Sequence, residues 1–275
     1  MMERVTIFCF EASYAVALAL ELLQLMKPKP LLRVLGLGFG SAGFLAHTLF
    51  ILAQPPSLAD PLGSVLFLAW ILAIFYLYGS VHHRHLAWGL FVLPFVLGLI
   101  VLGELFPSGL TAARGSLWDD LLHLRGERFW GILHGVLLLC AAVGVSVGCV
   151  ASVMYLVQVE KLRAKTAPGQ GMKMLSLERI EAMNRRAILW AFPFLTVGLL
   201  VGIGLQVQRN EFTEGWSSPK ILSVLGLWVV FAILLYLRYG VHVRGRQAAW
   251  WTLLAFGLML LALVSGHPFL QGGTS

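Results

Sequence analysis

Histidines are the side chains of this sequence whose placement could support chemistry. Apolar segments alternate with polar connections along the chain, so the order of the segments assigns each segment end to one of two membrane faces. By this order His47, His134 and His267 share one face. The other face receives His82, His83, His85 and His242. The first three are therefore candidates for a common binding site.

His134 and His267 form the pair of greatest interest. Each stands beside an aromatic residue, Trp130 or Phe269. Neutral imidazole is a good axial ligand for haem iron, and two imidazoles from separate helices can hold a macrocycle from both faces. Trp216, in a connection on the same face, could lie against such a flat ring. The alternative is that these interfacial histidines and tryptophans only anchor the chain at the membrane surface.

Other kinds of site receive less support from the sequence. A zinc site is not indicated, because no carboxylate or cysteine joins these histidines at ligand spacing. Cys9, Cys140 and Cys149 lie in apolar segments without CxxC spacing and are expected to pack as small residues. No nucleophile elbow, P-loop or HExxH motif is present. We therefore expect a binding or assembly factor rather than an enzyme.

A histidine-rich run and a glutamate within an apolar segment can each be interpreted in more than one way. The run from His82 to His85, with Arg84 inside it, fits a polar turn or a transient contact with a metal or haem. Glu11 lies deep in the first apolar segment. An ionisable residue at membrane depth is a functional candidate, so Glu11 could face a polar interior or a proton path.

The composition is that of an integral membrane protein. Of 275 residues, 59% are hydrophobic and 12% are charged, whereas a soluble domain carries about 25% charged residues. The net charge of +7 does not indicate nucleic-acid binding, because the basic residues lie mainly in short connections between apolar segments. We expect an all-α, polytopic protein with eight transmembrane helices in a single domain, residues 1–275.

The expected transmembrane helices cover residues 5–26, 31–53, 62–80, 86–106, 129–159, 187–208, 221–237 and 247–266. Glycines recur at four-residue spacing in three of them, which permits close helix packing. These pairs are Gly36/Gly40, Gly144/Gly148 and Gly198/Gly202. The two halves of the chain show no clear internal repeat by eye.

The distribution of Lys and Arg predicts the orientation. The connections after helices 1, 3, 5 and 7, together with Arg33 at the start of the second helix, hold 14 of the 20 basic residues, and the remaining connections and both termini hold 6. The richer side should be cytoplasmic. Both termini and the end of the fifth helix that bears His134 are then expected outside, in a bacterial plasma membrane.

The connection before the sixth helix carries its own pattern. Residues 172–186 place Leu175, Ile180 and Met183 among charged residues. This pattern fits a short amphipathic helix on the cytoplasmic surface, with Ser176 as its N-cap. The alternative is a solvated, charged connector.

Four short stretches, taken together, resemble a known family. They are Trp130–His134 opening a long helix with a basic end; Leu175–Glu178 followed by Asn184–Arg186 and Phe192–Thr196; Trp216–Lys220; and Arg244–Arg246 followed by Phe256-Gly257 and His267. In order and spacing, residues 129–275 resemble the cytochrome c assembly family, which includes CcsA-type and HemX-like proteins. The first half is similar more loosely, through His47 and the eight spans.

The resemblance implies a haem-handling protein of cytochrome c biogenesis. In that family the histidines at the places of His134 and His267 are external haem ligands beside a tryptophan-rich motif. That motif here reads Trp216-Ser-Ser-Pro-Lys220, with a serine for the family's aspartate, which is closer to the HemX-like branch. His47 would be an inner or relay ligand, and a Ccs-type maturation partner is expected. The alternative is a HemX-like regulator of tetrapyrrole synthesis that acts on glutamyl-tRNA reductase from its cytoplasmic face.

Overall fold

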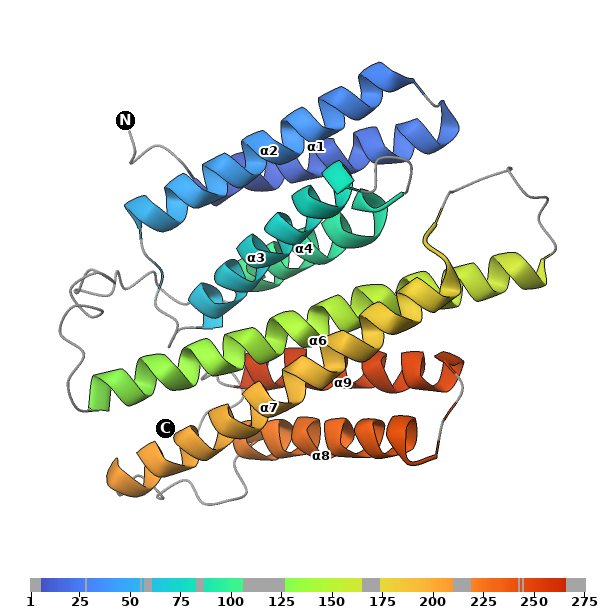
Figure 1. Cartoon of the computed structure of the whole chain (residues 1–275). Helices are drawn as coiled ribbons and strands as arrows, with labels where there is room; N and C mark the ends of the chain where they lie inside the picture. Colours follow the sequence, from blue (N-terminus) through green and yellow to red (C-terminus); the bar gives the residue numbers. More distant parts are fainter. Residues whose placement is uncertain are drawn as a thin grey trace. The chain divides into compact units, whose positions relative to one another are not determined.

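The computed structural model describes the helices and most of the short turns between them. The described residues are 6–27, 29–54, 56, 61–82, 87–105, 127–164, 174–209, 219–241, 243 and 245–265. All elements among them are helical (Figure 1). In chain order they are α1 (Ile7–Met26), α2 (Pro30–Ala53), α3 (Pro61–His82), α4 (Gly89–Leu105), α6 (Glu127–Arg163), α7 (Leu177–Arg209), α8 (Pro219–Tyr239) and α9 (Gly245–Ser265).

The helices have the length and composition of a polytopic membrane protein. Within the described residues, seven helices are long and apolar enough to cross a bilayer. The other helix, α4, is apolar and has 17 residues, which is the lower limit for a span. The expected all-α membrane fold is confirmed. The helices group into two compact units, one built mainly on α1–α4 and one on α6–α9.

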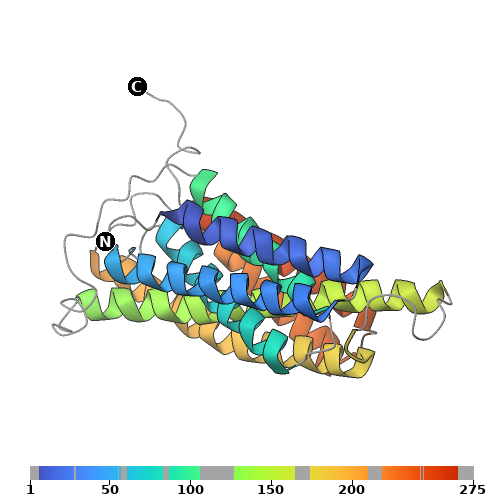
Figure 2. The same ribbon diagram turned by 90° about the horizontal axis from the view of Figure 1, so that it is seen from above.

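In the unit of α1–α4, helix α1 packs against α2 and α4 (Figure 2). Helix α2 buries a stripe of small residues, Gly36, Gly40 and Gly43. A Cβ at Gly40 would lie 2.5 Å from a ring carbon of Tyr76, and one at Gly43 would lie 3.0 Å from the ring of Tyr14. The glycines therefore make room for two aromatic side chains from neighbouring helices.

In the unit of α6–α9, glycines bring helix backbones together. A Cβ at Gly144 of α6 would lie 2.7 Å from the Cβ of Ala191 and 2.9 Å from the carbonyl oxygen of Ala187, both on α7. Small residues at a membrane helix interface allow this approach. The packing expected from the glycine spacing in this helix is confirmed.

The same set of contacts occurs once within each unit, although no internal repeat is evident in the sequence. In the first unit the Trp70 Nε1 of α3 donates to Thr48 Oγ1 of α2 at 2.9 Å. In the second unit the Trp228 Nε1 of α8 donates to Thr196 Oγ1 of α7 at 3.0 Å. Each threonine also donates to the carbonyl of a phenylalanine one turn earlier, at 2.8 Å.

These phenylalanines complete the correspondence. Phe44 stacks on Trp70, and Phe192 lies beside Trp228, with ring centroids 5.8 Å apart in both cases. In both units the threonine lies on the second helix of four and the tryptophan on the third. In each unit the third helix runs antiparallel to the second (Figure 1), so the two units share this part of their topology as well as these contacts.

One helix is longer than the sequence pattern suggested. Helix α7 runs without a break from Leu177 to Arg209, so residues 177–186 of the expected surface helix and the expected span of residues 187–208 belong to one element. The first residues of the expected surface helix, 172 and 173, lie outside the described residues. The sequence around Arg186 and Ala187 contains no glycine or proline that would end a helix. Ser176 precedes the first helical residue, which is the expected N-cap position.

The closest glycine contact of the first unit gives a stability prediction. Gly79 of α3 lies against the Trp88 indole, which donates to the Phe75 carbonyl at 3.2 Å. We expect Gly79→Ala to displace this indole and to lower the free energy of unfolding by about 1–3 kcal/mol, the usual cost of overpacking. Denaturant unfolding of the protein in detergent micelles measures this loss.

Gly98 of α4 supplies the matched control. A Cβ at Gly98 would meet nothing within 4 Å, so Gly98→Ala should be neutral or stabilising by up to about 1 kcal/mol. Equal stability losses in both variants would contradict the packing described for Trp88.

Candidate functional site

His134 lies in the third turn of α6 and is held by α7. Its Nδ1 lies 2.7 Å from the carbonyl oxygen of Gly198. A carbonyl oxygen only accepts hydrogen bonds, so Nδ1 carries the proton and Nε2 carries the lone pair of the neutral ring. Metal-bound histidines commonly have this arrangement, because a carbonyl on one nitrogen fixes the tautomer and orients the other nitrogen.

Gly202, one turn beyond Gly198, leaves the space that the His134 ring occupies. A Cβ at Gly202 would lie 2.6 Å from Cε1 and 3.0 Å from Nδ1 of His134. The glycine pair expected to serve helix packing therefore has a second role. Gly198 supplies the carbonyl partner and Gly202 supplies the space.

Aromatic side chains surround the start of α6. The rings of Phe129 and Trp130 meet edge to face, with centroids 5.4 Å apart. Trp130 is 46% exposed and precedes His134 by one helical turn, so both lie toward one face of α6. His134 itself is half-buried. The imidazole thus stands beside an exposed indole, as the sequence indicated.

The other two residues of the expected outer site cannot be assigned a geometry. His267 and Trp216 lie outside the described residues. Helix α9 ends at Ser265, two positions before His267, and α8 begins at Pro219, three positions after Trp216. Their roles remain predictions from the sequence.

His47 lies in the other unit, and its surroundings differ from those of His134. The side chain is fully buried between α1 and α2. Its ring stacks on Phe10, with centroids 4.1 Å apart and planes 1° from parallel. Tyr14 approaches its edge at 6.2 Å between centroids. Within the described part of the chain, neither ring nitrogen of His47 has a hydrogen-bond partner.

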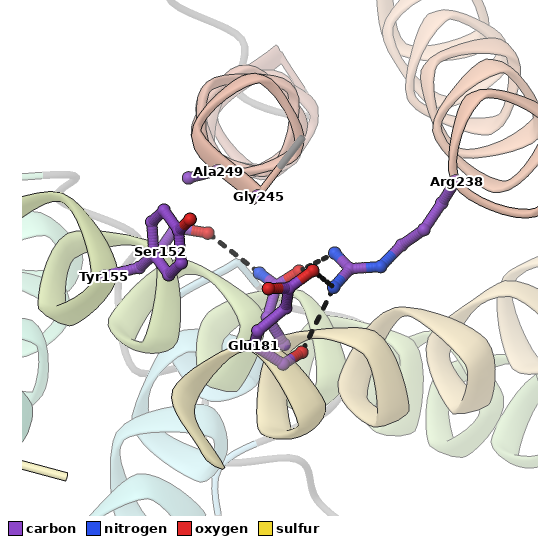
Figure 3. A pocket seen from close by; sticks show the side chains of 7 residues that line it. Ser152, Tyr155, Glu181, Arg238, Gly245 and Ala249 are labelled. Carbon is purple, nitrogen blue, oxygen red and sulfur yellow. Dashed lines mark hydrogen bonds and ion pairs between the residues drawn. The ribbon is translucent and has the colours of Figure 1, made fainter. Parts of the chain in front are cut away.

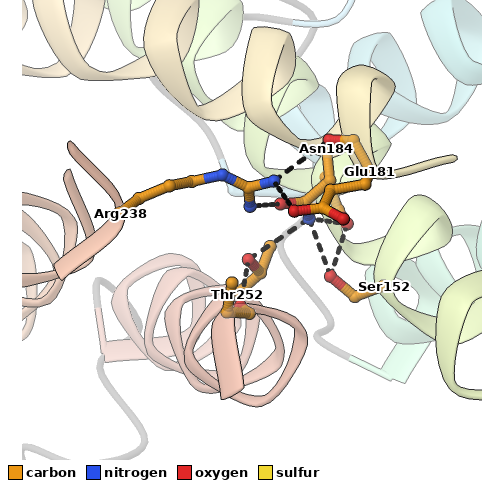
Figure 4. A network of polar contacts seen from close by, with 7 residues as sticks. Ser152, Glu181, Asn184, Arg238 and Thr252 are labelled. Carbon is orange, nitrogen blue, oxygen red and sulfur yellow. Dashed lines mark hydrogen bonds and ion pairs between the residues drawn. The ribbon is translucent and has the colours of Figure 1, made fainter. Parts of the chain in front are cut away.

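A polar cluster in the second unit was not expected from the sequence. Arg238 of α8 donates from Nη1 to Asn184 Oδ1 at 2.8 Å and from Nη2 to Glu181 Oε1 at 3.2 Å (Figure 4). The Arg238 side chain is only 8% exposed. Asn184 Nδ2 donates to the Gly148 carbonyl at 2.9 Å and to Ser152 Oγ at 2.8 Å. Asn184 therefore joins α7 to α6 and α8.

A small cavity lies beside this cluster (Figure 3). Its volume is about 10 Å³, enough for one water molecule. Ser152, Tyr155, Glu181, Asn184, Arg238, Gly245 and Ala249 line it. The sequence pattern assigned Arg238 to a connection and Asn184 to a surface helix. The only sequence signal was the polarity of two residues adjoining apolar runs.

The described ranges also bear on whether the protein forms a metal site of its own. No group of three or more His, Cys, Asp or Glu side chains gathers there. The donor set available at His134 is a single imidazole nitrogen with a fixed tautomer. Such a donor fits an axial position on an iron already held by a macrocycle better than it fits a protein-only metal cage.

Comparisons with known proteins identify the family. The family described as Cytochrome C assembly protein matches residues 58–267. The match begins before α3 and therefore takes in more of the chain than residues 129–275, where the resemblance was found by inspection. No solved structure matches the chain.

Three relatives illustrate the similarity. Protein HemX of Brevibacillus brevis is 26% identical over 203 residues, which cover 72% of this chain and 70% of that protein. Cytochrome c biogenesis protein CcsA of Gloeobacter violaceus is 24% identical over 288 residues, covering 84% and 82%. CcsA of Chlamydomonas reinhardtii is 30% identical over 122 residues, covering 44% and 33%. Because the family match spans most of the chain, the chain belongs to the cytochrome c assembly protein family.

Proposed function

We propose that this protein handles haem in cytochrome c biogenesis and binds it at the outer membrane face. The axial ligands would be His134 and His267, with Trp216 beside the ring. The observation that carries the proposal is the hydrogen bond from His134 Nδ1 to the Gly198 carbonyl at 2.7 Å. It leaves Nε2 as the lone-pair nitrogen that iron requires.

The surroundings of His134 support a ligand with a large apolar surface. The ring is half-buried, and the exposed indole of Trp130 stands one turn away on the same helix. A flat macrocycle can cover such an indole while its iron meets the imidazole. Bound haem would supply an iron centre and a porphyrin ring, whereas the chain would supply the ligands and the shape of the site.

Binding and transfer require no bond-making chemistry from the protein. Within the described residues His134 has a partner that orients it, but no carboxylate dyad or nucleophile–base pair accompanies it. The protein would hold haem or pass it on, together with a Ccs-type maturation partner. We place it in a bacterial plasma membrane, with both termini outside, on the strength of the distribution of Lys and Arg.

His47 would have a secondary role in haem binding. A role as an inner or relay ligand is supported by its two ring nitrogens, which have no partner among the described residues. Its ring is stacked on Phe10 and fully buried, so an iron would reach it only after the α1–α2 contact had opened. His134 is therefore the primary ligand of this proposal.

The visible spectrum of the purified protein tests the site. In detergent, the wild type should show the sharp reduced bands of six-coordinate haem, because two imidazoles would coordinate the iron. The double variant His134→Ala/His267→Ala should lose these bands. His82→Ala is the control, because His82 is an exposed histidine of α3 that bonds the Tyr78 carbonyl. A wild-type protein that stays colourless after haem is added would contradict the proposal.

The close approach of Gly202 to the His134 ring provides a second test, with a control variant on the same helix. Gly202→Ala places a methyl group against the His134 ring, so we expect haem affinity to fall at least about tenfold, or roughly 1.4 kcal/mol. Gly204→Ala lies two residues away on the same helix and meets nothing within 4 Å. Haem titrations should separate the two variants; indistinguishable affinities would mean that His134 is not the ligand.

A second function has one structural observation in its favour. Leu175, just before α7, and Ile180 in its first turns are buried, whereas Arg179 and Arg186 are exposed. A charged helical face of this kind, on the cytoplasmic side, suits a regulator that acts on glutamyl-tRNA reductase. The similarity to a HemX protein makes this alternative worth testing.

Charge reversal on that face distinguishes the alternative. If the chain is such a regulator, Arg179→Glu/Arg186→Glu should return the cellular abundance of the reductase to the level of cells that lack the protein, without changing the haem spectrum. Arg163→Glu at the end of α6 controls for a general loss of positive charge. Immunoblots of the reductase provide the measurement, and unchanged abundance in the double variant would count against the regulator.

A further inference from the structure

The unit of α1–α4 contains a row of buried polar groups that the proposed haem site does not use. It begins at His47, whose side chain is fully buried. The Tyr14 hydroxyl beside it is also buried and, like both His47 nitrogens, has no hydrogen-bond partner in the described ranges. Each such group in a membrane-spanning helix costs several kcal/mol unless it is satisfied, so the arrangement requires an explanation.

Tyr76 of α3 continues the row. The rings of Tyr14 and Tyr76 occupy neighbouring gaps on α2, at Gly43 and Gly40, and the two side chains are close enough to interact electrostatically. The Tyr76 hydroxyl donates to the Gly36 carbonyl over 3.5 Å, which is a long and weak hydrogen bond. The Ser80 hydroxyl, one turn further along α3, is also buried and lies close to the Tyr76 hydroxyl.

Glu21 of α1 completes the row at the end of the unit where α1 meets α2. A Cβ at Gly89 would lie 2.7 Å from Glu21 Oε1 and 2.8 Å from a ring carbon of Tyr76, so the carboxylate and the phenol are neighbours. Arg33 of α2 is within electrostatic reach of Glu21. Arg33 also donates to the Ser80 carbonyl at 3.5 Å.

The row follows the axis of the helices. From Arg33 to His47 the chain advances along α2 by about 21 Å, at 1.5 Å per residue. A bilayer core is about 30 Å thick, so the row extends from one end of the unit through most of that depth. Glu21, Tyr76, Tyr14 and His47 can each accept one proton and release another.

We propose that these four side chains form a proton relay that connects water at the Glu21 end of the unit with the His47 imidazole. A proton from that water binds the Glu21 carboxylate. Each tyrosine hydroxyl then accepts a proton on its oxygen lone pair and releases its own proton onward. The lone-pair nitrogen of His47 takes up the last one and becomes an imidazolium, and the reverse sequence returns the proton to the water.

Water molecules entering from the Glu21 end would bridge the hydroxyl groups along the row. Glu11 of α1 directly follows Phe10, whose ring stacks on His47, so this carboxyl group lies at the His47 end of the unit. Glu11 and Glu104 of α4 interact with each other there. Tyr78 and His82 of α3 are exposed and stack on one another. Neither pair belongs to the relay.

The relay is tested on haem-free protein, so the result does not depend on the proposed haem function. The full chain is labelled with ¹⁵N-histidine and placed in lipid nanodiscs, and His47→Gln identifies the His47 signal. We expect the protons of the His47 ring to exchange with water. Tyr76→Phe and Glu21→Gln should slow that exchange at least about tenfold.

Tyr78→Phe is the matched control, because this tyrosine lies on the same helix and is 58% exposed. It should leave the exchange rate unchanged. Tyr76→Phe keeps the ring that fills the gap at Gly40, and Glu21→Gln provides an independent variant on another helix. A His47 ring whose protons do not exchange with water in the wild type, or exchange rates equal in all variants, would overturn the relay.

Discussion

The Asn184 amide is the contact on which the second unit depends most. Lipid offers no hydrogen bonds, so polar groups inside a helix bundle must satisfy one another. Asn184 donates to the Gly148 carbonyl and to Ser152 on α6, and at 3.3 Å to Thr252 on α9. It also accepts from Arg238 on α8. One side chain of α7 therefore contacts the other three helices, and the Glu181 carboxylate of the same helix balances the charge of the Arg238 guanidinium.

The two units use the same tryptophan–threonine contact but differ in how they treat histidine. In the second unit His134 comes from the first helix and is oriented by a carbonyl of the second. In the first unit His47 comes from the second helix and rests on Phe10 of the first, without a polar partner in the described residues. An oriented imidazole suits a ligand role, whereas the buried, unpartnered imidazole of His47 is the end point of the relay proposed above.

A second correspondence lies closer to the basic connections. Arg33 and Glu181 stand at the same distance before Thr48 and Thr196, and Ser80 and Arg238 stand at the same distance after Trp70 and Trp228. In the first unit the arginine is on the second helix and reaches the third. In the second unit the arginine is on the third helix and reaches the second. In each unit one buried or half-buried arginine thus bridges the second and third helices. The arginine lies on the second helix in the first unit and on the third helix in the second unit.

The sequence by itself determined the all-helical membrane fold, the approximate helix boundaries, the family and the selection of His134, because each depends on local composition or on short motifs. It did not predict that α7 is continuous, since a charged segment followed by an apolar one can be one helix or two. Only the tertiary structure decided that Gly198 orients His134, that Asn184 meets Arg238, and that the units share their contacts. In a membrane helix, lipid-facing and buried positions are both apolar, so the sequence carries little information about which residues of different helices meet.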